Sequence, residues 1–179
     1  MSLGLKRGTV ELMPYDPEWA RLFEQEKISI QDVLKDDALG IEHIGSTAIP
    51  GMDAKPILDL MVAVKQIDDY SEFMISLKKL GYSFMRDNRS EQEHILFVKG
   101  PDECRTHYLK LTTLGTRFWH EHLLFRDHLI NHPDRAEAYR KLKHDLLRKF
   151  SDDRASYTNA KAAFIQDTIK LAELETSGH

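Results

Sequence analysis

The feature that most constrains this fold is an apolar run at residues 57–64, Ile-Leu-Asp-Leu-Met-Val-Ala-Val. Such a run, with little polar alternation, predicts a central β-strand covered on both faces. One acid, Asp59, interrupts it. Because successive side chains of a strand point to opposite faces, we expect Asp59 to share a face with Ile57 and Met61.

The rest of the chain shows strand patterns in its first two thirds and helical patterns afterwards. A short strand or an extended arm is expected at 8–13, and strands are expected at 41–44, 82–85, 94–99 and 105–112. Helices are expected at about 16–36, 68–81, 116–131, 134–150 and 153–174. This order predicts an α+β protein, with a mixed β-sheet flanked by helices and a C-terminal helical set. We expect one domain over 1–179, with a sheet portion at about 8–115 and a helical portion at about 116–175.

Composition excludes several classes of protein. Apolar residues make up 41% of the chain and charged residues 30%, which is typical of a globular protein rather than a disordered one. No apolar run approaches the length of a membrane span, and the start lacks the apolar stretch of a secretion signal. The single cysteine, Cys104, cannot form an internal disulfide, so we expect a cytoplasmic protein.

Charge is unevenly distributed along the chain. Residues 117–161 carry 10 Lys and Arg against 7 Asp and Glu, although the whole chain has a net charge of −4. A mildly basic helical stretch beside an acidic sheet portion favours a small anionic ligand, or simply gives a solvated helix surface. Nucleic-acid binding needs a far more basic surface and is not expected.

A Gly45-Ser46 pair follows the strand at 41–44 and begins a loop. Such a turn lets backbone N–H groups and a small hydroxyl approach an anion closely, although the same pair also forms ordinary turns. The carboxylate of Asp59 is costly in an apolar strand unless a metal, a cation or hydrogen bonds compensate it. It therefore marks a functional site, or it is satisfied by backbone amides or by Lys55.

This Gly-Ser turn and the acid on the next strand resemble the nucleotidyltransferase superfamily. There the turn holds a triphosphate, and two acids spaced i, i+2 bind magnesium. Asp59 matches the second acid, whereas Ile57, which has no ligand atom, stands at the first. The resemblance implies one divalent metal (Mg²⁺, Mn²⁺ or Zn²⁺) rather than two, because two-metal phosphoryl transfer needs oxygen ligands for both ions.

A more specific resemblance, to the GrpB family, covers nearly the whole chain. Its motifs include His-Ile-Gly-Ser-Thr-Ala-Ile-Pro-Gly at 43–51, Lys-Pro-Ile-Leu-Asp at 55–59 and Arg-Thr-His-Tyr at 105–108; further matching segments lie at 10–19, 122–133 and 157–165. The family is described as uncharacterised with a nucleotidyltransferase-like fold, and relatives fused to dephospho-coenzyme A kinase suggest nucleotide or coenzyme A chemistry. Family members often carry further histidines after the position of His107, where this chain has Tyr108 and Lys110.

Position and family resemblance single out His43 and His107 as partners for Asp59. Together the three residues offer carboxylate and imidazole ligands for one transition metal, with Asp59 and His107 as the metal-binding candidates. Alternatively, either histidine is a general base, or a packed or surface residue. Packed or surface positions are expected for the histidines at 120, 122, 128, 132 and 144.

Basic and hydroxyl side chains complete the predicted ligand site. Besides Gly45, Ser46 and Lys55, the candidates for contacting phosphate are Thr47, Arg105, Arg126, Lys143 and Lys161. Arg126 can clamp a phosphate with its planar guanidinium or pair with an acid to fix its helix. The two helical lysines contribute to a phosphate site, or each faces solvent.

Three functions stay open at this point. The first is an enzyme that transfers a nucleotidyl or phosphoryl group with one divalent metal. The second is a module that binds a nucleotide or phosphorylated metabolite without catalysis, and the third is an interaction protein with a degenerate site. A further acid beside Asp59 would favour the enzyme, the candidates being Glu42, Glu93, Asp102 and Glu103.

Overall fold

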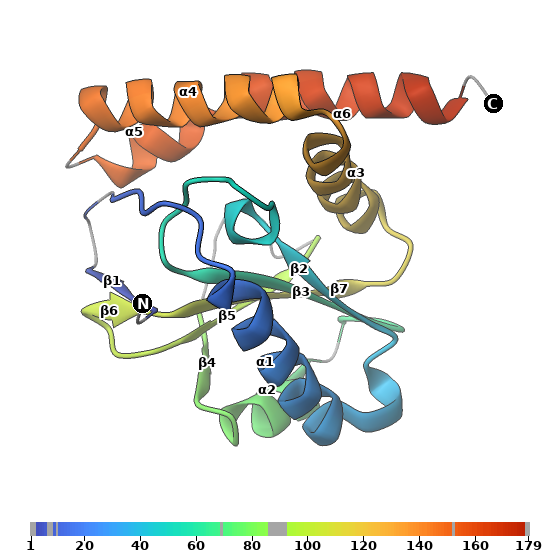
Figure 1. The fold of residues 1–179 in the computed structure, drawn as a ribbon. Helices are drawn as coiled ribbons and strands as arrows, with labels where there is room; N and C mark the ends of the chain where they lie inside the picture. Colours follow the sequence, from blue (N-terminus) through green and yellow to red (C-terminus); the bar gives the residue numbers. More distant parts are fainter. Residues whose placement is uncertain are drawn as a thin grey trace.

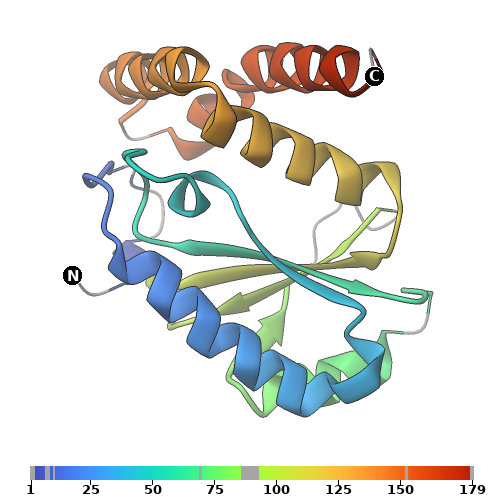
Figure 2. The same cartoon turned by 45° about the vertical axis from the view of Figure 1, so that its right-hand side comes forward.

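A computed structural model describes residues 3–6, 9, 11–68, 70–85, 93–151 and 153–177. A five-stranded sheet forms the centre of the molecule (Figure 1). Helices α1 (Glu18–Leu34) and α2 (Ser71–Lys78) lie on one side of it. The other side is covered by α3 (Arg117–Asn131), α4 (Pro133–Lys149), α5 (Arg154–Asn159) and α6 (Ala162–Ser177), as Figure 2 shows from a second direction.

The sheet has the strand order β2-β3-β7-β5-β4. Its members are β2 (Gly40–Ile44), β3 (Leu58–Val64), β7 (His107–Thr113), β5 (Ile95–Lys99) and β4 (Tyr82–Phe84). Only the β3–β7 pair is parallel. The mixed sheet flanked by helices, and hence the α+β class, confirms the expectation from sequence.

The central strand separates two apolar layers. Leu58 and Leu60 pack with α1 residues such as Phe23, whereas Met61 packs on the opposite face with Trp119 of α3. Because side chains alternate along a strand, Asp59 lies on the α3 face with Met61, as its position in the run predicts.

Two local expectations were wrong. The helix expected at 153–174 is two helices, α5 and α6, separated at Ala160–Lys161. The second helix begins at Ser71 rather than at the Asp68-Asp69 pair, of which Asp69 lies outside the described residues. Of the short strand or extended arm expected at 8–13, the described residues show a single bridge between Met13 and Ala54; residues 7, 8, 10 and 152 also lie outside the described part.

A small two-stranded ladder lies apart from the main sheet, between β1 (Leu5–Lys6) and β6 (Cys104–Arg105). Within the described ranges, no helix combines the length and the apolar character that a membrane crossing requires.

Candidate functional site

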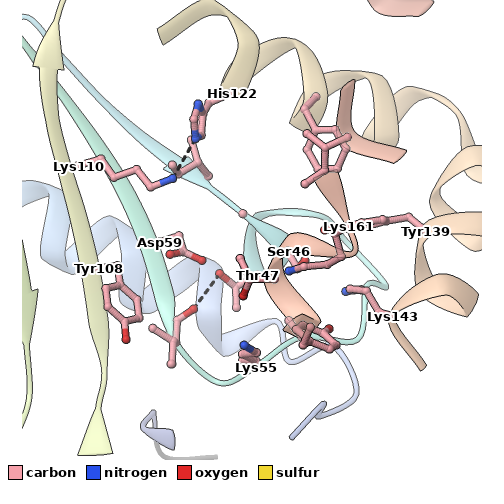
Figure 3. A pocket seen from close by; sticks show the side chains of 18 of the residues that line it. Ser46, Thr47, Lys55, Asp59, Tyr108, Lys110, His122, Tyr139, Lys143 and Lys161 are labelled. Carbon is pink, nitrogen blue, oxygen red and sulfur yellow. Dashed lines mark hydrogen bonds between the residues drawn. The ribbon is translucent and has the colours of Figure 1, made fainter. Parts of the chain in front are cut away.

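A cavity of about 370 Å³ lies between the α3 face of the sheet and the C-terminal helices (Figure 3). The loop after β2 and the start of β3 form one wall, and β7 contributes Tyr108 and Lys110. The opposite wall comes from α3 to α6, through residues that include His122, Phe125, Tyr139, Lys143, Tyr157, Lys161 and Ile165. Segments far apart in the sequence therefore enclose one space.

Gly45 begins the loop in a conformation that favours glycine. Its φ is 72° and its ψ is −173°, a combination that side chains rarely tolerate. A Cβ atom on Gly45 would lie 2.6 Å from Oδ2 of Asp59, too close for a real contact. The loop then continues into a short 3-10 turn, η2 (Ser46–Ala48). Glycine therefore lets the Gly-Ser turn lie directly against the Asp59 carboxylate.

Asp59 faces the cavity from the middle of the sheet. It is half-buried and pairs in register with Ile44 of β2 and Tyr108 of β7. Ile57 lines the same cavity but offers no ligand atom. Among the described residues, no group of three metal-ligating side chains includes Asp59.

Lys143 of α4 is the most deeply buried charged group at the cavity, with 1% of its surface exposed. Its Nζ donates a hydrogen bond to the backbone oxygen of Asp53 and lies 5.1 Å from the centre of the Tyr139 ring. Burial and, to a smaller extent, the positive charge of Lys161 lower the pKa of Lys143 to about 7. The expectation of a solvent-facing lysine is wrong for this residue.

Two more lysines stand beside Lys143 on this wall. The Nζ atoms of Lys55 and Lys161 each lie 4.7 Å from the centre of the Tyr157 ring. This geometry is that of a cation–π contact, which holds the two long side chains at the cavity. Figure 3 shows the side chains of all three lysines at the pocket. We call Lys55, Lys143 and Lys161 the lysine wall.

Tyr139 connects the lysine wall to the Gly-Ser turn. Burial raises the pKa of Tyr139, and the nearby Ser46 side chain opposes this rise. Burial also raises the pKa of Tyr157 to about 12. Both phenols therefore stay protonated at neutral pH, so they add no negative charge to the wall.

At the other end of the cavity, Lys110 of β7 meets His122 of α3. The Lys110 Nζ lies 2.9 Å from Nε2 of His122, and Nδ1 of the same ring lies 2.9 Å from the Phe118 carbonyl oxygen. Burial and the Lys110 charge lower the pKa of His122 to about 3. A neutral imidazole satisfies both contacts, with Nε2 accepting from Lys110 and Nδ1–H donating to Phe118.

The family model described as GrpB protein matches residues 9–171. The chain belongs to the GrpB family. A relative from Pseudomonas aeruginosa, named UPF0157 protein PA4798, is 41% identical over 155 residues, which is 85% of this chain and 63% of that longer protein. The crystal structure of GrpB from Enterococcus faecalis has a TM-score of 0.84 at 32% identity and covers 94% of this chain and 100% of that one.

The fold of this GrpB-family chain is also similar to that of a more distant protein. The Cid1 poly(U) polymerase structure has a TM-score of 0.50 at 12% identity, covering 78% of this chain and 43% of that one. At this identity the likeness concerns the fold alone, and it agrees with the fold that the sequence predicts.

The structure does not bring the two candidate histidines to Asp59. Although β7 is adjacent to β3, His43 pairs in register with Leu60 and His107 with Leu58, on the α1 face. His43 stacks on an α1 phenylalanine with ring centres 4.7 Å apart, and its Nε2 lies 2.9 Å from Thr47 Oγ1. Nδ1 of His107 lies 2.8 Å from Thr106 Oγ1. Burial is the largest cause that lowers the pKa of each histidine to about 4.

Arg126 and Arg105 also lie outside the cavity lining. Arg126 pairs with Glu42 at 2.6 Å and donates to the His43 carbonyl oxygen at 2.9 Å, which ties α3 to β2. Of its two expected roles, the structure shows the helix-fixing pair. Arg105 pairs with Asp102 and donates to the Gly100 carbonyl oxygen, so it braces a turn.

None of the acids proposed to assist Asp59 (Glu42, Glu93, Asp102 and Glu103) lines the cavity that the described residues form. Instead Glu121 does, and it pairs with Arg117 at 2.6 Å. Sequence reasoning missed Glu121, His122 and Lys110 as lining residues.

Proposed function

We propose that this GrpB-family chain binds a small phosphorylated ligand of the nucleotide class in the cavity between the sheet and the C-terminal helices. The observation that carries the proposal is the lysine wall, above all the buried Lys143. Charged side chains are rarely buried without a functional or structural reason, and perturbed pKa values concentrate at ligand sites.

The charge state of Lys143 supports an anionic ligand. At a pKa of about 7, this lysine is only partly protonated at neutral pH. A phosphate placed beside it supplies the negative charge that favours the ammonium form, and Lys55 and Lys161 add two further donors. Ligand and lysine wall thus stabilise each other electrostatically.

Shape and lining also fit a nucleotide-sized molecule. The volume of about 370 Å³ falls within the usual range of small-molecule sites. Phe125, Ile165 and Ile169 provide apolar surface for a base or another apolar group. The Gly45-Ser46 turn, at the other wall, offers a small hydroxyl and a backbone that a ligand can approach closely.

A second candidate function is transfer of a nucleotidyl or phosphoryl group, favoured by the position of Asp59 against the Gly-Ser turn. A single carboxylate can hold Mg²⁺ or Mn²⁺ when substrate phosphates and waters complete the coordination. Ile57 occupies the position of the first acid of the pair and offers no oxygen ligand. Binding without catalysis is therefore the better supported of the two functions.

Thermal-shift and calorimetric titrations with ATP, pyrophosphate and dephospho-coenzyme A test the proposal. Wild type and Lys141→Gln, a control on α4 whose side chain is 72% exposed, should be stabilised by at least one of these probes. Lys55→Gln and Lys161→Gln should bind it about tenfold or more weakly, because each removes a charge-assisted contact worth roughly 1.5–3 kcal/mol. Equal affinity in all variants, or no binding to any probe, would overturn the proposal.

The same titrations with Mg²⁺ or Mn²⁺ separate the two candidates. Release of phosphate or pyrophosphate by wild type, lost in Asp59→Asn while binding persists, would favour group transfer. Binding with no turnover in any metal would favour a module without catalysis.

A further inference from the structure

A second cluster of potential metal ligands lies outside the cavity, where α3 meets α6. His128 lies in the last turn of α3, His132 is the residue that follows the end of this helix, and Glu175 lies on α6. One ligand atom from each of the three side chains lies within 4.8 Å of the other two. A pair of histidines at i and i+4 presents two imidazoles on one helix face, and the carboxylate supplies a third ligand from the neighbouring helix.

The distances within the cluster suit tetrahedral coordination. Nδ1 of His128 lies 3.3 Å from Oε2 of Glu175, and Nε2 of His132 lies 3.2 Å from Oε1. In a regular tetrahedron the edge is about 1.6 times the distance from centre to corner, so zinc–ligand bonds of about 2.0–2.1 Å place ligand atoms roughly 3.3 Å apart. Each histidine nitrogen therefore lies at about this separation from one oxygen of the Glu175 carboxylate.

A hydrogen bond of His132 determines which of its ring nitrogens is available to a metal. Nδ1 of His132 lies 2.9 Å from the backbone oxygen of His128, to which only a protonated nitrogen can donate. This contact makes Nδ1 a protonated nitrogen and leaves Nε2, 3.2 Å from Oε1 of Glu175, as the nitrogen available to a metal. The two rings are nearly parallel, with centres 3.9 Å apart.

His128 carries the second independent sign of a ligand. Its side chain is only 5% exposed. Within the described residues its Nδ1 makes no well-directed hydrogen bond, although Oε2 of Glu175 is 3.3 Å away. A buried polar atom without a hydrogen-bond partner costs free energy. A bound ion would explain why such an atom is tolerated here.

We infer that His128, His132 and Glu175 bind a divalent transition-metal ion, with Zn²⁺ the best match, and that this ion ties α6 to α3. Imidazole nitrogen with one carboxylate suits zinc and its neighbours, whereas Mg²⁺ and Ca²⁺ prefer sites made of oxygen alone. The ion can enter from solvent, because 42% of the His132 side chain and 53% of the Glu175 side chain are exposed. Three protein ligands leave the fourth position to water.

The metal site is independent of the proposed ligand cavity, although both involve α6. That helix contributes Ile165, Gln166 and Ile169 to the cavity lining, and Glu175 lies beyond them along the same helix. The ion would thus hold in place a helix that forms part of the cavity wall, without contacting a ligand there.

Zinc binding by the untagged, chelator-treated full chain tests the inference. Equilibrium dialysis and calorimetry with ZnCl₂ should show one tight equivalent, and Co²⁺ should give the intense visible absorption of tetrahedral cobalt. His132→Ala and Glu175→Gln should each weaken binding at least about tenfold, since losing even an outer-shell partner of a metal site costs 10–100-fold. These two positions are used because they are accessible, so the variants should fold.

Matched controls are His120→Ala, which removes an exposed histidine of α3, and Glu173→Gln, which removes an exposed glutamate of α6. Both should bind zinc as wild type does, and zinc should raise the Tm of wild type and controls but not of the ligand variants. Equal binding by all five proteins, or no stoichiometric binding by wild type, would overturn the inference. Asp59→Asn should leave zinc binding unchanged, so failure here and failure of the proposed function are distinguishable.

Discussion

The buried Lys143 should make the stability of the protein depend on pH in a defined direction. Its pKa is about 7 in the folded chain, against the ordinary value of 10.5. Between these two pH values the unfolded chain holds more protons at this site than the folded chain does. The free energy of unfolding should therefore rise with pH across this window, by up to about 1.4 kcal/mol per pH unit from this group.

Lys143→Met removes the titrating group while keeping a long apolar stem. Between about pH 7.5 and 9.5 wild type should gain up to roughly 2–3 kcal/mol relative to this variant. The variant also leaves the Asp53 carbonyl without its donor, which costs about 1–3 kcal/mol at every pH. The difference in slope, and not the difference at one pH, is therefore the measure of the lysine.

Urea unfolding of wild type, Lys143→Met and Lys141→Met at several pH values across this range measures the slopes. Lys141 belongs to the same helix but is exposed, so its variant should run parallel to wild type. If wild type and Lys143→Met also run parallel, Lys143 titrates as an ordinary lysine, and the electrostatic reasoning for the lysine wall is refuted.

Two further predictions concern the surroundings of the cavity. Gly45→Ala should lose about 1–3 kcal/mol, a Tm decrease of roughly 2–12 °C, because the residue needs a glycine conformation and its Cβ would collide with Asp59. Gly51→Ala, with a positive φ of 76° but open space around the new Cβ, is the control; equal Tm losses would contradict the collision. Arg126→Ala should lower the free energy of unfolding by about 1–3 kcal/mol, because it removes the pair with Glu42. A double-mutant cycle with Glu42→Gln should show a coupling energy above about 0.5 kcal/mol. Additive losses would show that the pair does not tie α3 to β2.

The sequence was most informative where the pattern is local. The apolar run at 57–64 predicted β3 and the face of Asp59, and the Gly-Ser pair predicted the loop beside it. Both follow from alternation and from glycine's conformational freedom, which neighbouring residues alone determine.

Register between distant strands could not be predicted in this way. A shift of one residue between β3 and β7 reverses which side chains share a face, so the sequence could not decide whether His107 or Tyr108 accompanies Asp59. In the structure, Tyr108 is the residue that pairs in register with Asp59.

The burial of individual helical residues could not be predicted from the sequence either. Lys143 and His122 resemble other polar residues of their helices, and only the docking of those helices on the sheet covers them. The break between α5 and α6 at Ala160–Lys161 could not be predicted either, because no proline or glycine marks it in the sequence.

The two walls of the cavity, one around residues 44–59 and the other at 139–169, have a thermodynamic consequence. If the C-terminal helices open locally while the sheet stays folded, the lysines of α4 and of the α5–α6 turn leave Asp59 and the cavity ceases to exist. Affinity for any molecule that touches both walls is then linked to the free energy of that local opening. Substitutions that loosen α6 should weaken binding from a distance, and a bound molecule should slow amide hydrogen exchange throughout the helical layer.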